Sequence, residues 1–155
     1  MQFAAQYQQA PVPRDGNLIK WSWFKFYDSP PRPGPGDRLI VSWDTAMSSN
    51  QPSDFSVCVV LLAHGETVYI LDVIRARLDY PDLRRAVMFQ HGRWGQTPAA
   101  YSLLIEKKGA GLSLIQDLQR ENNIYVVGID PDGDKLSFPK IISGRIGDAA
   151  LPRWE

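Results

Sequence analysis

The most constraining feature of this sequence is an apolar segment that ends on a carboxylate. Residues 39–43 are mostly apolar and β-prone, and Asp44 follows them directly. This pattern predicts a buried central strand. A carboxylate is costly to desolvate, so we expect Asp44 at the end of the sheet, where a ligand or a metal ion can reach it. If the sequence held only one strand that ends on a carboxylate, the alternative interpretation would be a solvated loop aspartate.

Further strand-like and helix-like segments follow in the order β-β-β-α-β-α-β. The five expected strands cover residues 39–43, 55–62, 68–75, 100–106 and 124–129, with a hairpin connection at 63–67. The first helix is expected to begin at Asp79 and to stop at Gly92 or Gly95, and the second to end at residues 122–123. The residues expected to face inward are Leu83, Ala86, Val87 and Gln90 in the first helix, and Leu112, Ile115 and Leu118 in the second.

This order predicts an α/β fold in which a mixed sheet is flanked by helices, the ribonuclease H-like arrangement. The first strand is then central, and the fourth strand lies beside it. The fourth strand also ends on a carboxylate, Glu106. Asp44 and Glu106 are therefore expected at neighbouring strand ends.

Composition sets looser bounds on function. The 155 residues suit one domain, no stretch is long and apolar enough for a membrane span, and no signal peptide opens the chain. The single cysteine, Cys58, is expected to be buried, which together with the missing signal suggests a cytoplasmic setting. The formal net charge is zero, so any DNA contact must come from a local patch or a partner domain. His64 is expected to be a solvated turn residue and His91 a partner of the helix dipole.

Residues 1–37 differ from the rest, because they hold six of the 12 prolines. We expect an extended linker or docking segment here, with the domain proper at residues 38–155. An aromatic block between the prolines includes Trp21, Trp23 and Phe24. It is expected to pack on the body of the domain, and the alternative is a surface that docks another domain. Residues 130–155 are polar, without periodicity, and are expected to form loops.

Two carboxylates held together repel unless a cation keeps both ionised. Hard oxygen ligands suit Mg²⁺ or Mn²⁺, and two such ions can support phosphodiester hydrolysis. Asp44 and Glu106 are thus candidate metal ligands and catalytic residues. The following turn adds candidate phosphate or DNA contacts, namely Lys107, Lys108, Gly109 and Gly111. The alternative for this turn is a tight connection between strand and helix.

Several short motifs, in this order, resemble the C-terminal nuclease domain of the large terminase subunit of tailed phages. They are Asp44-Thr-Ala, Ser53-Asp-Phe-Ser-Val57, Tyr69-Ile-Leu-Asp-Val73, Tyr80-Pro-Asp-Leu83, Ile105-Glu-Lys-Lys-Gly-Ala-Gly111 and Leu114-Ile-Gln-Asp-Leu118. The resemblance runs from about Gln8 to Trp154. It implies a metal-dependent endonuclease that cuts concatemeric viral DNA, in which Asp44 and Glu106 match the first two metal-binding acids. The implied partners are double-stranded DNA, the packaging ATPase domain, the small terminase subunit and the portal, in the cytoplasm of a bacterial host.

The family's third acid lies on a later helix, and this chain ends at Glu155 before it, so the domain is expected to be incomplete at its C-terminus. Asp130, Asp132 or Asp134 would have to substitute. No phosphate-binding loop of an ATPase is present in the sequence. The main alternative is therefore an inactive prophage remnant that serves only in binding or assembly. An actin-like ATP-binding domain and transposase- or resolvase-type nucleases are further alternatives.

Overall fold

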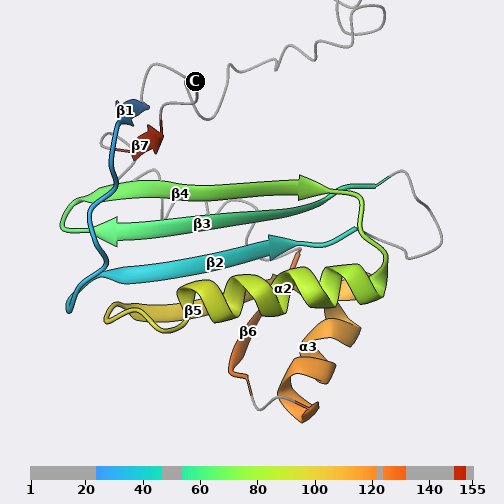
Figure 1. Ribbon diagram of the computed structural model, residues 1–155. Coiled ribbons are helices and arrows are strands. Elements are labelled where there is room, and N and C mark those ends of the chain that lie inside the picture. Colours follow the sequence, from blue (N-terminus) through green and yellow to red (C-terminus); the bar gives the residue numbers. More distant parts are fainter. Residues whose placement is uncertain (1–23, 47–53, 122–123, 132–148, 153–155) are drawn as a thin grey trace, which may run out of the picture.

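The computed structural model describes residues 24–46, 54–121 and 124–131, and the backbone of residues 149–152 (Figure 1). Seven strands and two helices are described. They are β1 (Lys25–Tyr27), β2 (Arg38–Asp44), β3 (Ser56–His64), β4 (Thr67–Ala76), α2 (Tyr80–Trp94), β5 (Ala100–Glu106), α3 (Ala110–Glu121), β6 (Val126–Ile129) and β7 (Ala149–Pro152). No helix within these ranges is both long and apolar enough to cross a membrane.

The strands form one mixed sheet in the order β1-β7-β4-β3-β2-β5-β6. Strands β2, β3 and β4 are an antiparallel meander, and β5 and β6 add in parallel on the other side of β2. From β2 to β6 the element order is the β-β-β-α-β-α-β order that the sequence predicts. The central position of β2, beside β5, is confirmed as well.

Both helices pack on the same face of this sheet, because the crossovers β4-α2-β5 and β5-α3-β6 advance in the same direction and such connections are right-handed (Figure 1). The core lies between this face and the helices. Its members from the central strands include Leu39, Val41 and Trp43 of β2 and Leu103 and Ile105 of β5, each at most 1% exposed. Each such buried side chain stabilises the fold by about 1.5–3 kcal/mol.

The local signals of helix α2 act as expected. Asp79 is its N-cap and accepts a hydrogen bond from the amide of Asp82, a proline occupies the first turn, and Gly95 caps the C-terminus. Of the two expected stop positions, the structure thus selects Gly95. Leu83, Val87 and Gln90 are buried, and Ala86 packs against the core, so the predicted inner stripe is confirmed.

Three local predictions are wrong in whole or in part. In α3 Leu118 is buried and Ile115 packs on the core as predicted, but Leu112 is 48% exposed, and Gly111 and Leu114 are buried instead. His64 closes strand β3, and the turn to β4 consists of Gly65 and Glu66, with Gly65 at a φ of 59°. Residues 149–152 form strand β7 within the segment that was expected to be loops.

Cys58 is fully buried, as predicted. Of the aromatic block, Trp21 and Trp23 lie outside the described residues. Tyr27 packs on the domain, since its hydroxyl donates to the carbonyl of Ile70 and its ring contacts Tyr69, while Phe26 is 48% exposed.

Candidate active site at the ends of strands β2 and β5

Asp44 and Glu106 are the last residues of two adjacent parallel strands, β2 and β5. The register pairs Trp43 with Ile105, so the two acids occupy the next position on each strand. Paired residues of neighbouring strands point to the same face of a sheet. The structure therefore brings the two acids together at one end of the sheet, as the sequence predicts.

The two acids lie on the face of the sheet opposite helices α2 and α3. In the described part of the chain this face bears no helix, and it is called the open face. Trp43 and Ile105, one position earlier, belong to the core under the helices, and side chains alternate between faces along a strand. Asp44 is exposed and Glu106 is half-buried. A carboxylate pair at the carboxyl ends of parallel strands lies where a polar ligand can approach an α/β sheet.

Thr45 fixes the two strand ends relative to each other. It is 3% exposed, and its hydroxyl donates to the carbonyl of Lys108, 3.2 Å away, in the turn after β5. The next residue, Ala46, donates its amide to the hydroxyl of Ser56 at the start of β3. Each bond contributes about 1 kcal/mol, and together they join β2 to both of its neighbours beside the acids.

Gly111 completes this junction from the helix side. A Cβ atom at this position would lie 2.1 Å from the carbonyl oxygen of Glu106 and 2.9 Å from the hydroxyl oxygen of Thr45. Only a residue without a side chain lets the first turn of α3 pack this closely on the end of β5. Gly111 therefore sets the position of the Glu106 backbone.

Three amides of the turn between β5 and α3 are hydrogen-bonded, two of them locally and one to strand β6. The amides of Lys107, Lys108 and Gly111 donate to the carbonyls of Ile129, Glu106 and Lys108, respectively. Gly109 has a φ of 50°, which glycine adopts readily. A tight connection between strand and helix accounts for these bonds.

The lysines of the turn occupy different surroundings. Lys107 is exposed and forms an ion pair with Asp130, with 3.1 Å between nitrogen and oxygen, and its side chain runs across Gly128. Lys108 is partly buried. Asp130 follows β6, which is separated from β2 by β5, whereas Asp132 and Asp134 lie outside the described residues.

Carboxylate oxygens are the donor type that hard divalent cations prefer, because Mg²⁺ and Mn²⁺ bind through few protein oxygens and keep waters or phosphate oxygens as other ligands. Within the described ranges, no group of three or more Asp, Glu, His or Cys residues is arranged to hold a metal ion. The candidate donors at this end of the sheet are therefore the two acids that the sequence predicts, Asp44 and Glu106.

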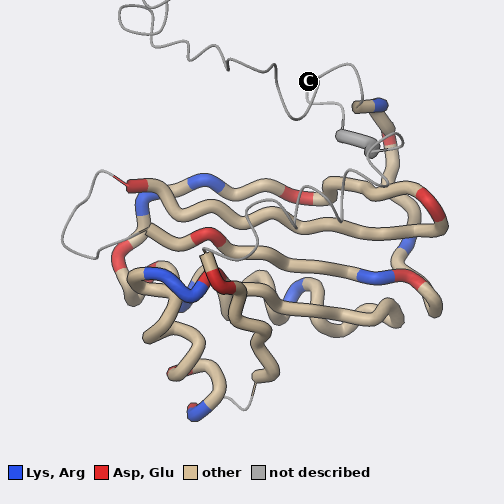
Figure 2. Tube along the Cα trace, turned by 180° about the vertical axis from the view of Figure 1, so that it is seen from behind, with Lys and Arg blue, Asp and Glu red and all other residues tan. Residues whose placement is uncertain are grey.

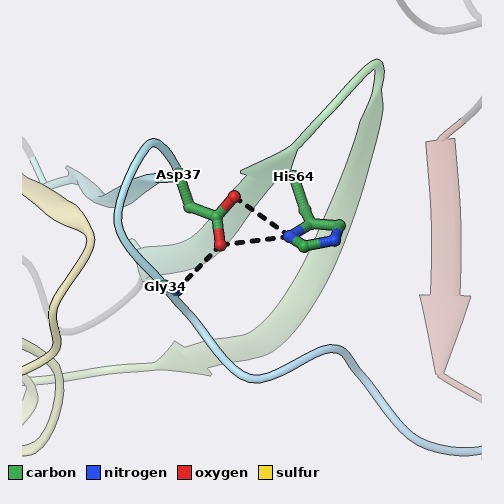
Figure 3. A network of polar contacts seen from close by, with 3 residues as sticks. All are labelled: Gly34, Asp37 and His64. Carbon is green, nitrogen blue, oxygen red and sulfur yellow. Dashed lines mark hydrogen bonds and ion pairs between the residues drawn. The ribbon is translucent and has the colours of Figure 1, made fainter.

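A second polar cluster, at the opposite end of the sheet, is structural (Figure 3). The buried carboxylate of Asp37 accepts the amide of Gly34 at 2.8 Å and lies 3.0 Å from Nδ1 of His64. These bonds hold the pKa of Asp37 below its ordinary value, mainly through His64. They tie the segment before β2 to the β3–β4 hairpin. His64 is half exposed, as expected of a solvated residue, but it ends strand β3 and contacts Asp37, which the sequence did not predict.

Sequence reasoning missed Thr45 as the link between the strand ends, although a small polar residue directly after a buried strand is a usable signal. It also missed the contact between helices α2 and α3, where the hydroxyl of Tyr80 donates to Asp117 and Arg84 pairs with Glu121 at 2.7 Å. Burial and the Asp117 carboxylate raise the pKa of Tyr80 to about 12.

No protein-family model matches this sequence, and no curated protein matches it either. The fold, however, resembles solved structures of the large terminase from a thermophilic bacteriophage. One crystal form of that protein superposes with a TM-score of 0.61 at 11% identity, over 88% of this chain and 32% of the terminase. Its complex with ATP-gamma-S superposes with a TM-score of 0.59 at 12% identity, over 87% of this chain and 33% of the terminase.

The chain thus spans about a third of the length of these terminase structures. At this low identity the likeness establishes a shared fold. Together with the strand order, it confirms the ribonuclease H-like arrangement of a mixed sheet with flanking helices.

Proposed function

We propose that this chain is a metal-dependent DNA endonuclease domain of the phage terminase type. The observation that carries the proposal is the placement of Asp44 and Glu106 at the ends of adjacent parallel strands, in register and on the same open face. The shared fold with a phage large terminase agrees with this assignment.

The substrate would be the phosphodiester backbone of double-stranded viral DNA. Asp44 and Glu106 would hold Mg²⁺ or Mn²⁺ through their carboxylate oxygens. Bound there, the cation would activate a water molecule and stabilise the leaving oxygen of the phosphodiester. Thr45 and Gly111 would keep the two carboxylates at a fixed separation, which a metal site requires. Lys107 and Lys108 are the candidate phosphate contacts beside them, and Lys107 would exchange its ion pair with Asp130 for a phosphate.

In this proposal the chain works in the cytoplasm of a bacterial host, next to a packaging ATPase domain, the small terminase subunit and the portal. These partners rest on the resemblance of the sequence motifs.

A binding or assembly module without nuclease activity is the second candidate. It is favoured by the donor set, because the described residues supply two acids rather than three and Asp130 is paired with Lys107. A second metal ion would then lack a protein ligand, and a two-metal mechanism would be impaired.

The two candidates are separated by nicking of supercoiled plasmid DNA in Mn²⁺ and in Mg²⁺. We expect slow nicking that does not depend on DNA sequence and is faster in Mn²⁺, since Mg²⁺ demands near-ideal octahedral geometry. Asp44→Asn, which keeps the shape of the side chain and removes its charge, should abolish nicking.

Glu66→Gln is the matched control, because it removes one exposed carboxylate from the hairpin turn at the opposite end of the sheet. All variants should be purified in parallel and should have matching circular dichroism spectra. Equal nicking by the wild type and Asp44→Asn would refute the role of Asp44. An inactive wild type that binds no Mn²⁺ in calorimetry would leave the binding module as the function.

A further inference from the structure

We infer that Phe55, Arg75 and Arg77 form a separate contact for the DNA backbone, on the β3–β4 side of the acid pair. This inference rests on the proposed function, because it assumes that a DNA duplex passes over the open face of the sheet. The three residues are called the Phe55 clamp below.

The clamp is built around one aromatic ring. The guanidinium carbon of Arg75 lies 3.4 Å from the ring centroid of Phe55, and that of Arg77 lies 4.6 Å from it. Both arginines are exposed, and Phe55 is half-buried. Two cations therefore gather on one ring at the surface, although their charges repel.

The clamp shares its face with Asp44. The register of the sheet pairs Asp44 with Val57 of β3 and Val57 with Arg75 of β4, so these three side chains point to the same side. Phe55 lies directly before β3, and its contact with Arg75 places its ring on the same side. A row of residues on the open face therefore connects Arg75 to the acid pair.

The distance along this row suits a DNA backbone. Two strand spacings separate Arg75 from Asp44, which amounts to about 10 Å between their backbones. The axial rise of DNA is about 3.4 Å per nucleotide, so a duplex whose axis ran along this row would place about three nucleotides between the acids and Arg75. Figure 2, which shows the chain from behind, has acidic and basic positions at this same end of the sheet.

Stacking prepares these arginines for phosphate binding. A guanidinium that lies flat on a ring uses its face for the ring, while its N–H donors point outward from its edge. The outward N–H donors of the two guanidinium groups match the oxygens of phosphate groups. Because the ring already restricts both arginine side chains, phosphate binding costs less side-chain entropy. A nucleobase would have to displace Arg75 to stack on Phe55, so the geometry favours phosphate over base contact.

The charges of three other arginines are already compensated within the described residues. Arg84 pairs with Glu121, Arg85 with Asp82, and Arg93 with Asp72. Arg75 and Arg77 contact the uncharged ring instead and form no ion pair with another described residue, so this part of the chain does not neutralise their positive charge. For a chain with zero net charge, such a local patch supplies the attraction that composition does not.

The test is the salt dependence of binding to a fluorescein-labelled duplex of about two helical turns, followed by fluorescence anisotropy in EDTA, so that no catalytic metal contributes. Each lost phosphate contact lowers the slope of log affinity against log salt by about 0.9. For Arg75→Ala/Arg77→Ala we expect a slope lower by about 1.8. Its affinity should then fall about twelvefold less than that of the wild type between about 50 and 200 mM salt.

Two variants control this test. Arg84→Ala/Arg85→Ala removes the same charge from helix α2 and should keep the wild-type slope. Phe55→Leu keeps the net charge and an apolar side chain, and it should weaken binding because the guanidinium groups lose their support. Each variant should retain the melting temperature of the wild type within a few degrees.

Equal slopes for the two double variants, or a wild type that binds no duplex, would overturn the inference. Nicking that Asp44→Asn abolishes would leave the proposed endonuclease standing in either case. Conversely, a reduced slope for Arg75→Ala/Arg77→Ala with no nicking by the wild type would support the clamp in a DNA-binding module.

Discussion

Gly111→Ala probes the junction that holds Glu106. Alanine in place of glycine within a helix gains up to about 1 kcal/mol of helix propensity. The new Cβ, however, would lie 2.1 Å from the carbonyl oxygen of Glu106 and 2.9 Å from the hydroxyl oxygen of Thr45. Overpacking costs about 1–3 kcal/mol, and the upper end applies because a backbone carbonyl cannot rotate away. The expected net loss is about 2 kcal/mol.

Gly92→Ala in helix α2 is the matched control. It makes the same chemical change in a helix, but no atom lies within 4 Å of the new Cβ. It should therefore gain about 0.5–1 kcal/mol. The two variants differ in the space around the methyl group, so their difference of about 3 kcal/mol measures the packing of Gly111 on β5.

Thermal unfolding followed by circular dichroism is the assay, and urea unfolding gives the free energies. For a chain of this size, 1 kcal/mol corresponds to about 2–4 °C in melting temperature. We expect Gly111→Ala to melt about 4–8 °C below the wild type and Gly92→Ala to melt about 1–4 °C above it. A Gly111→Ala protein as stable as the wild type would show that α3 does not press on Glu106.

Two further predictions concern titratable groups. The pKa of Asp37 is lowered in the folded state, mainly by His64, so its contribution to stability is present above the unfolded pKa of about 3.9 and is lost as the pH falls through the folded value. Asp37→Asn should therefore lose less stability than the wild type when the pH is lowered below about 4. Identical acid-unfolding curves for the two proteins would contradict the pairing. Burial raises the pKa of the Cys58 thiol to about 12, so it should resist a thiol reagent at about pH 8 until urea unfolds the chain, and rapid reaction of the native protein would contradict its burial.

The central sheet was predictable because its signals are local. Residues 39–43, 100–106 and 124–129 are short apolar runs bounded by turn residues, and each falls on a strand that the core buries on one face. The two acids were predictable for the same reason, since a charge directly after such a run must lie where the strand leaves the core.

Helix α3 shows where periodicity is insufficient. Leu112, Ile115 and Leu118 follow one helical stripe, and Gly111, Leu114 and Leu118 follow another, rotated by about one residue. The close packing of Gly111 on Glu106 selects the second stripe, and that contact is made in the tertiary structure. The Asp37–His64 pair, 27 residues apart in sequence, has no local signal either.

Strands β1 and β7 have a consequence for how the chain folds. Lys25–Tyr27 pairs with Ala150–Pro152, so this edge of the sheet joins segments more than 120 residues apart. Contacts of such high sequence separation form late. During synthesis, the outer edge of β4 at Val68 and Tyr69 stays unpaired until β7 has been made. An unpaired edge invites association with other chains, and the charges of Asp72 and Arg75 farther along β4 oppose it. The interval before β7 emerges from the ribosome is thus when this chain is most exposed to aggregation.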